Sequence, residues 1–353
     1  MSNRDDGGAS SPGHAETLFA TPEWFAIWSA AFGQDNYNVW RPAGAARDLA
    51  IPYCRQHVKI TGLSLPIARS AANYYSPRYD VIGGEHDSID PNELLRELDV
   101  SCADFYGVSE HSRLLKGIER RIEPNQIQRD LFEIAPFVDC TKPWDSYWAG
   151  RGKNLRSNLL SIEKKLRGSR VEVLRLAEWD EIEHLRETIY EVEASGWKGR
   201  QGTAIVQSAK VRSFYDQLLF EFGRRDLLRL FVLRIDGDVV AFELNTLYRG
   251  VLSALKGGFR ETFAKVSPGQ FLRHAFLQWA FAEPQVTFYD MLGPASETKT
   301  RWATGSETLF TVRVFRRSLT GLLFRARFVA GPRVKAYLAR RRRGVPIPPG
   351  ALV

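Results

Sequence analysis

Residues 227–259 read LLRLFVLRIDGDVVAFELNTLYRGVLSALKGGF, and this stretch decides the fold. Two apolar runs meet at Asp236-Gly237, a pair that favours the tight turn of a β-hairpin because both central positions need a positive φ. Arg249-Gly250 marks a second turn into a further apolar run. The stretch therefore predicts three consecutive antiparallel strands.

The flanking residues alternate between helical and strand periodicity. A strand is expected at 286–292 after a helix at 268–282, so a strand, a loop, a helix and a returning strand follow one another. Ahead of the hairpin we expect a basic helix at 151–166, a strand at 171–175, a helix at 180–195, a glycine-rich loop at 196–202 and a helix at 209–222.

The turn before the helix at 268–282 has the residues of an anion site. Ser267 suits an N-cap, and Pro268 suits the first helical position because it has no amide hydrogen to leave unpaired. Gly269 lets a ligand approach the backbone closely. The amides of a first helical turn and the helix dipole favour a bound pyrophosphate. An ordinary capped helix is the alternative that this turn leaves open when it is considered alone.

The positive charge of the chain is concentrated near its C-terminus. The 353 residues carry a formal net charge of +8, but no Asp or Glu follows Glu307, whereas eleven Arg and Lys lie at residues 313–343. Without those eleven the rest of the chain carries about −3, so the body is not a uniformly basic nucleic-acid-binding surface. Residues 319–339 mix apolar and basic side chains, which predicts either a helix on an anionic membrane surface or one packed back on the domain.

Composition bounds the class of protein. No run of eighteen apolar residues occurs, and the first twenty residues lack the apolar core of a secretory signal. Cys54, Cys102 and Cys140 are far apart, which indicates reduced, buried thiols. The six histidines have no metal-ligand spacing, so no metal is expected. We expect a cytoplasmic protein that could also lie on the inner face of the membrane.

The second half of the chain contains five short motifs of glycine, aromatic and polar residues. They are Gly196-Trp197-Lys198-Gly199-Arg200-Gln201-Gly202, Phe242-Glu243-Leu244-Asn245-Thr246, Ala254-Leu255-Lys256-Gly257-Gly258, Ser267-Pro268-Gly269-Gln270 and Phe288-Tyr289-Asp290-Met291-Leu292-Gly293. Together they resemble the GNAT superfamily of acyltransferases, and more closely its CelD/BcsL type, a bacterial group associated with polysaccharide production. Pro22-Glu23-Trp24-Phe25 and the residues at 74–80 and 154–159 extend the resemblance over 21–315.

This resemblance implies an α+β fold, an α/β sandwich of two GNAT-like halves as in the related FemABX group. Each half would be a mixed, mostly antiparallel sheet flanked by helices. The expected organisation is a disordered lead at 1–20, an N-terminal half at 21–150, an acyltransferase half at 151–315 and a basic helical tail at 316–353.

The resemblance also assigns a donor site. The pyrophosphate of an acyl-CoA would lie on the turn of Ser267, Pro268, Gly269 and Gln270, and the pantetheine arm would follow the strand at 251–259 where it diverges from the strand at 286–292. The remaining residues assigned to this co-substrate are Lys256 and Gly257. No metal is implied.

Three residues near that divergence are predicted to be catalytic. Glu243 would take a proton from the acceptor if it points inward, and strand alternation makes the solvated face equally open. Asp290 ends a strand at the expected mouth of the site, where a turn cap is the alternative. Lys299 falls where related proteins carry a lysine that closes the site, with an exposed helix charge as the alternative.

Three further residues are assigned to the acceptor side. Trp197 and Lys198 belong to the glycine-rich loop, and Trp302 falls where related proteins carry an aromatic residue that closes the site. A tryptophan that merely anchors the loop on the core remains the alternative for Trp197.

The predicted function is transfer of an acetyl or acyl group from an acyl-CoA-type thioester, such as acetyl-CoA, to an amine or hydroxyl in polysaccharide or cell-envelope biosynthesis. The expected partners are a small-molecule or saccharide acceptor and, through the tail, an anionic membrane; nucleic acid is disfavoured. Two alternatives stay open: a FemABX-like transferase that uses aminoacyl-tRNA, and a non-catalytic binding protein with the same fold.

Overall fold

The computed structural model describes the chain outside residues 1–10, 13–15, 34–35, 43–48, 85–88 and 332–353, and describes the backbone alone at Trp197 and Lys198. It divides into two compact units that are not contiguous in sequence. Unit 1 consists of Met1–Phe32, Tyr74–Pro77 and Glu133–Thr308, and unit 2 of Gly33–Asn73, Arg78–Phe132 and Leu309–Val353.

Unit 1 contains a mixed sheet in the strand order β6-β7-β8-β9-β10-β5. All neighbouring pairs described for it are antiparallel except β9 and β10, which are parallel. The strands are β6 (Val171–Leu176), β7 (Leu228–Ile235), β8 (Asp238–Tyr248), β9 (Val251–Phe259), β10 (Phe288–Asp290) and the last residues of β5 (Ile127–Asp139).

The hairpin and helix predictions for unit 1 are confirmed. Asp236 and Gly237 have φ of 53° and 93°, and Arg249 and Gly250 have φ of 47° and 85°, so both turns have the positive φ pair that was expected. The helices are α1 (Pro22–Trp28), α4 (Trp144–Ala149), α5 (Lys153–Leu166), α6 (Trp179–Ala194), α7 (Trp197–Arg200), α8 (Ala209–Gly223), α9 (Pro268–Ala282) and α10 (Glu297–Thr300). The glycine-rich loop at 196–202 thus contains a short helix that was not predicted.

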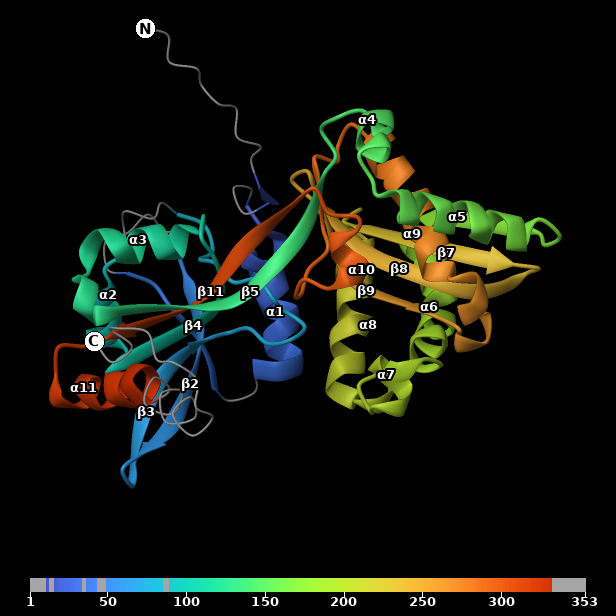
Figure 1. Cartoon of the computed structure of the whole chain (residues 1–353). Coiled ribbons are helices and arrows are strands. Elements are labelled where there is room, and N and C mark those ends of the chain that lie inside the picture. Colours follow the sequence, from blue (N-terminus) through green and yellow to red (C-terminus); the bar gives the residue numbers. More distant parts are fainter. Residues whose placement is uncertain (1–10, 13–15, 34–35, 43–48, 85–88, 332–353) are drawn as a thin grey trace, which may run out of the picture. The chain divides into compact units, whose positions relative to one another are not determined.

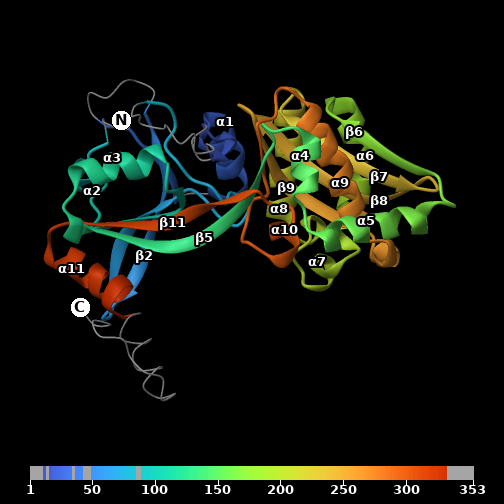
Figure 2. The ribbon, with the colours of Figure 1, turned by 45° about the horizontal axis from the view of Figure 1, so that its top comes forward.

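Two layers of helices enclose this sheet. In Figures 1 and 2, α5 and α9 lie on one face of β7, β8 and β9, and α6 and α8 lie on the other. The basic helix α5 buries the predicted stripe of Leu155, Leu159, Ile162 and Leu166 against the sheet and α9. On the other side, Trp24 of α1 contacts the rings of Phe214 and Phe222 in α8. The helix α1, which we expected in the N-terminal half, therefore packs in unit 1.

The strands of unit 2 are also mixed and mostly antiparallel, in the order β1-β2-β3-β4-β11, with the first residues of β5 next to β11. Its strands are β1 (Tyr37–Trp40), β2 (Ile51–Ile60), β3 (Leu63–Ser70), β4 (Cys102–Ser109) and most of β11 (Gly305–Phe315). Its helices are α2 (Pro91–Glu97), α3 (Arg113–Arg121) and α11 (Leu319–Arg325). Only β3 and β4 pair in parallel among the described pairs.

The first turns of the basic tail pack back on unit 2. Phe324 of α11 is fully buried in a cluster with Ile60, Ile67, Cys102 and Phe315. Leu319 and Leu322 remain 82% and 62% exposed. A π-helical segment at Ala326–Ala330 follows α11, and the part of the predicted tail helix from residue 332 on and the arginines at 340–343 lie outside the described residues.

Two global expectations can be compared with the described residues. The three cysteines are buried free thiols, as predicted. No helix in the described part is both long and apolar enough to cross a membrane.

Candidate active site

The parallel strands β9 and β10 stay together over only three residue pairs. Phe288, Tyr289 and Asp290 pair with Val251, Leu252 and Ser253. Strand β9 then continues to Phe259, whereas β10 ends and the chain turns away through Leu292 and Gly293, which have φ of 40° and 68°. Residues 254–258 of β9 therefore have no β10 partner in the described structure, which is the divergence that the sequence led us to expect.

A bulge in β9 sets which way its side chains point beyond this divergence. Leu244 of β8 faces Lys256, but Asn245 faces Ala254, so Leu255 is an extra residue. One extra residue reverses the alternation of a strand. As a result Lys256 points to the face covered by α6 and α8, and Gly257 lies opposite Glu243.

Lys256 is held in a buried ion pair. Its Nζ lies 2.8 Å from Oε1 of Glu193 on α6, and the two side chains are 7% and 0% exposed. The rings of Tyr75 and Tyr215 lie 5.5 and 5.4 Å from the same nitrogen. Oε2 of Glu193 accepts a hydrogen bond from the amide of Ile205 at 2.8 Å. These contacts occupy the ammonium group on the far side of the sheet from α9, so they lend no support to the predicted phosphate contact of Lys256.

Glu243 points inward, which is one of the two orientations that strand alternation left open. It is 8% exposed, and Tyr289 donates a hydrogen bond to its Oε1 at 2.6 Å. Arg273 of α9 donates to both carboxylate oxygens at 3.3 Å. Burial, followed by the charge of Glu243, raises the pKa of Tyr289 well above its usual range, so this phenol remains a donor.

The glycine opposite Glu243 keeps the space above the carboxylate open. A Cβ at Gly257 would lie 3.1 Å from Oε2 of Glu243 and 3.3 Å from the carbonyl oxygen of Phe242. Any side chain there would press on the carboxylate, so this position brings the backbone of β9 directly to the buried acid.

The turn before α9 has the predicted Pro268 at the first helical position. Ser267 takes the N-cap position with φ of 45°, and its side chain makes no capping hydrogen bond among the described residues. A side-chain cap needs an extended N-cap backbone, and the left-handed conformation of Ser267 removes that geometry. Its carbonyl instead accepts the amide of Gln270 at 3.0 Å. A Cβ at Gly269 would meet only the Phe259 ring, at 3.8 Å, so the helix end is accessible at this glycine.

Asp290 and Lys299 both hold the turn that follows β10. Oδ1 of the buried Asp290 accepts the amide of Leu292 at 3.0 Å, the turn-cap contact that was its alternative role. Lys299 donates to the carbonyl oxygens of Leu292 and Pro294. Burial is the main cause that lowers the pKa of Lys299. Their catalytic roles stay predictions.

Trp302 is fully buried and belongs to the core of unit 1. Its indole nitrogen donates to Oε1 of Gln270 at 3.2 Å, so it supports the α9 turn from beneath. Its carbonyl oxygen accepts Tyr147 at 2.7 Å and Arg151 at 3.1 Å. Its ring has no exposed surface for an acceptor, so the predicted substrate contact finds no support in its burial.

Trp197 and Lys198 begin the four-residue helix α7, and their side chains lie outside the described part of the chain. A Cβ at Gly199 would lie 1.8 Å from the carbonyl oxygen of Ala194, so a glycine is required where α7 meets α6. The acceptor-side role of this segment stays a prediction.

Sequence reasoning missed three residues of these networks, namely Arg273, Tyr289 and Glu193. Arg273 is the one Arg, Lys, Asp or Glu in the mostly apolar α9, and that isolation is the signal that could have marked it as a buried partner. Among the described residues, no group of three or more His, Cys, Asp or Glu side chains is placed to hold a metal ion.

Comparison with known proteins places this site in a familiar fold. Residues 153–300 match the family described as "Acetyltransferase (GNAT) domain". A search of curated proteins found no match. The family match supports a transferase, and residues 153–300 contain β9, β10 and the α9 turn.

Solved structures with low sequence identity share the fold of nearly the whole chain. A conserved protein of unknown function from Bacteroides thetaiotaomicron VPI-5482 has 10% identity and a TM-score of 0.56, over 83% of this chain and 90% of that chain. FemX has 11% identity and a TM-score of 0.51, over 81% and 90%. L-PGS from Bacillus licheniformis has 15% identity and a TM-score of 0.50, over 86% and 95%. The fold is therefore GNAT-like and related to that of FemX, as the α+β prediction stated.

Proposed function

We propose that residues 153–300 transfer an acyl group from an acyl-CoA-type thioester to an amine or hydroxyl. One observation carries this proposal: beyond its last pair with β10, β9 runs past Gly257, which faces the buried Glu243, to Phe259, whose ring is the nearest group to a Cβ built at Gly269 in the first turn of α9. The match of this region to an acetyltransferase family supports the same conclusion.

The donor would lie along residues 254–258 of β9, beyond the last residue pair that this strand forms with β10. Amides and carbonyls at 254–258 would pair with the pantetheine arm as a missing strand would. The first turn of α9 would hold the pyrophosphate, because its amides and dipole favour an anion and Gly269 leaves room for one. Gln270, fixed by Trp302, keeps that turn in place.

The chemistry would be direct attack on the thioester carbonyl. The acceptor nitrogen or oxygen forms a bond to the carbonyl carbon, and backbone amides of β9 stabilise the oxyanion. The carbon–sulfur bond then breaks and the donor leaves as a thiolate, which water or the protonated Glu243 then protonates. Glu243, directly or through a water, takes the proton that the acceptor loses. Arg273 and Tyr289 orient this carboxylate through their hydrogen bonds to it.

The acceptor and donor classes come from the sequence resemblance. A saccharide or another cell-envelope component fits a chain whose α11 exposes Leu319 and Leu322 ahead of a basic segment. An aminoacyl-tRNA remains the alternative donor, because the fold is shared with FemX.

The test is donor binding to matched variants. Isothermal titration with acetyl-CoA and longer acyl-CoAs should show binding that Gly269→Glu abolishes. Gln285→Glu is the control, because it adds the same charge at an exposed site beyond the other end of α9. Absence of binding by every acyl-CoA, or equal binding by both variants, would refute the proposed donor.

A second variant separates chemistry from binding. Glu243→Gln should retain donor binding while transfer to an accepted amine or hydroxyl falls by about 10²- to 10⁴-fold, the usual contribution of a general base. Unchanged transfer would exclude Glu243 as the proton acceptor.

A further inference from the structure

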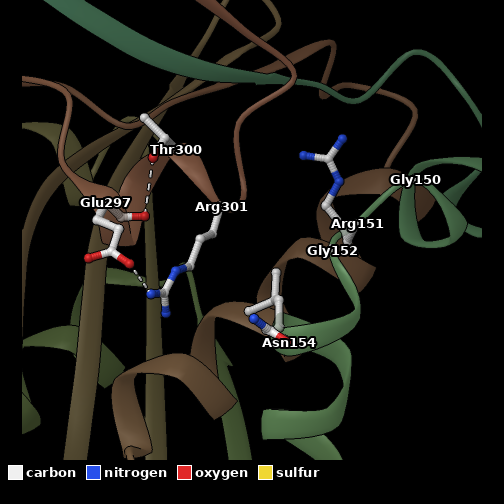
Figure 3. A pocket seen from close by; sticks show the side chains of 8 residues that line it. Gly150, Arg151, Gly152, Asn154, Glu297, Thr300 and Arg301 are labelled. Carbon is white, nitrogen blue, oxygen red and sulfur yellow. Dashed lines mark hydrogen bonds and ion pairs between the residues drawn. The ribbon is translucent and has the colours of Figure 1, made fainter.

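A cavity of about 460 Å³ opens in unit 1 between α10 and the start of α5. Figure 3 shows Glu297, Thr300 and Arg301 on one side and Arg151, Gly152 and Asn154 on the other. Its volume is within the range of small-molecule sites in proteins. None of the residues that line the cavity belongs to β9 or to the α9 turn.

The charge of this cavity is positive. Arg151 donates to the carbonyl oxygens of Trp302 at 3.1 Å and Ala303 at 2.6 Å, and its guanidinium lies 4.5 Å from the Tyr147 ring. These partners are neutral, and no ion pair with a carboxylate is described for Arg151. Its charge is therefore uncompensated beside the cavity.

The second arginine has a partner that it can exchange. Arg301 pairs with Glu297 one helical turn away, and the two side chains are 49% and 83% exposed. Such an exposed pair contributes little and opens at little cost. An anion in the cavity could therefore bind the guanidinium of Arg301, while the amide of Asn154 supplies a neutral donor.

We propose that this cavity is a second binding site, which takes a phosphate group of a substrate. Guanidinium groups match phosphate oxygens with paired hydrogen bonds, and the volume admits the phosphate together with part of the molecule that carries it. The identity of that molecule as an acyl-transfer substrate rests on the proposed function; the phosphate site does not.

Trp302 connects this site to the donor turn. Its indole nitrogen donates to Gln270 of that turn, and its carbonyl oxygen accepts Arg151 at the cavity. A phosphate that binds Arg151 therefore contacts a side chain that is hydrogen-bonded to Trp302, the residue that supports the α9 turn. Two sources can supply the phosphate: the nucleotide part of the acyl donor, or a phosphorylated acceptor such as a nucleotide sugar.

The experiment titrates the full chain with inorganic pyrophosphate and follows binding by calorimetry. Asn154→Asp places a carboxylate in the cavity, and it should leave the fold intact because acidic residues are favoured in the first turn of a helix such as α5. Arg301→Gln removes one guanidinium. Each should weaken pyrophosphate binding by about 10- to 100-fold, as expected for a lost charge-assisted hydrogen bond.

Arg225→Gln is the matched control. Arg225 lies just beyond the C-terminal end of α8, and its side chain, 44% exposed, makes exposed ion pairs with Glu221 and with Glu23. Its pyrophosphate affinity should equal that of the wild type. No binding of pyrophosphate, or equal binding by the control and both cavity variants, would overturn the inference.

Two further arms separate this site from the donor turn and identify the source. Pyrophosphate binding that persists in Gly269→Glu but is lost when Asn154→Asp is added belongs to the cavity, whatever becomes of the donor proposal. Binding that Gly269→Glu alone removes overturns the cavity site. If pyrophosphate binding confirms the cavity site, the affinities of wild type and Asn154→Asp for three ligands identify its source. A loss of affinity for CoA without a loss for 3′-dephospho-CoA assigns the phosphate to the donor. A loss of affinity for a UDP-sugar alone assigns it to the acceptor.

Discussion

Replacing Lys256 by methionine distinguishes the structural role of this lysine from the donor contact predicted from sequence. Nζ of Lys256 lies 2.8 Å from Oε1 of Glu193, and both side chains are almost entirely removed from solvent. Methionine has a similar length and adapts to irregular space, so the substitution removes the charge with little loss of volume. It leaves the Glu193 carboxylate buried without its counter-charge.

The cost follows from that burial. Removing one partner of a buried ion pair destabilises a protein by about 3–5 kcal/mol, because the other charge stays desolvated. Arg225→Met, which removes a charge from exposed ion pairs with Glu221 and Glu23, should lower the free energy of unfolding by less than about 1 kcal/mol. Replacing both Lys256 and Glu193 by apolar residues should recover much of the loss, because no buried charge is then left without its partner at this position.

Urea unfolding followed by circular dichroism and tryptophan fluorescence measures these differences, and acetyl-CoA titration of the same variants measures donor binding. The structure predicts a large loss of stability for Lys256→Met and unchanged affinity in the folded protein. A stability loss under about 1 kcal/mol together with a ten-fold weaker affinity would show that Lys256 contacts the donor and that the reasoning from the ion pair is wrong.

Three further variants test other contacts. Burial beside tryptophan rings lowers the pKa of His274, so the unfolded chain binds its proton more readily. This contribution to stability is complete above the unfolded pKa of about 6.5 and is lost as pH falls through the folded pKa. His274→Gln should therefore make the urea midpoint decline less steeply between about pH 7 and pH 5. A decline as steep as that of the wild type would contradict this. Tyr289→Phe removes a 2.6 Å hydrogen bond to the Glu243 carboxylate and should cost about 1.5–3 kcal/mol in urea unfolding; a neutral change would mean that the pair is not formed. Gly199→Ala places a Cβ 1.8 Å from the carbonyl oxygen of Ala194 and should increase amide exchange in α7, whereas unaltered exchange would argue against the close approach.

Local signals were sufficient for the central elements of unit 1. Asp236-Gly237 and Arg249-Gly250 specify turns through φ values that other residues adopt at a cost, so the β7–β8–β9 order could be predicted from sequence. Pro268 marks the start of α9 because proline fits the first turn of a helix and disrupts its interior.

Contacts between distant segments could not be predicted in the same way. Tyr74–Pro77 packs in unit 1 although the residues on both sides of it belong to unit 2, and α1 packs there although residues 33–73 and 78–132 separate it from most of unit 1. This placement depends on aromatic contacts such as that of Trp24 with Phe214, which leave no periodic pattern in the sequence. Strand β11 was missed for a related reason: Glu307 and Arg313 interrupt its apolar alternation, and both find partners within the fold.

In the candidate site too, local sequence signals could be read and contacts between distant segments could not. Glu243 was identified from its motif, but its inward orientation and its partners Arg273 and Tyr289 come from α9 and β10, which the sequence does not place beside β8. Lys256 was assigned to the donor from the family resemblance, which does not show the bulge in β9. The extra residue Leu255 turns that side chain to the other face of the sheet.

Hydrogen–deuterium exchange with and without acetyl-CoA tests the central claim, that the donor binds where β9 leaves β10 beside the first turn of α9. We expect acetyl-CoA to slow amide exchange in peptides that cover residues 254–258 and 267–271, with little change in exchange at the β7–β8 hairpin turn of Asp236-Gly237. Binding of acetyl-CoA that leaves both peptides unprotected, or that protects other segments instead, would contradict it.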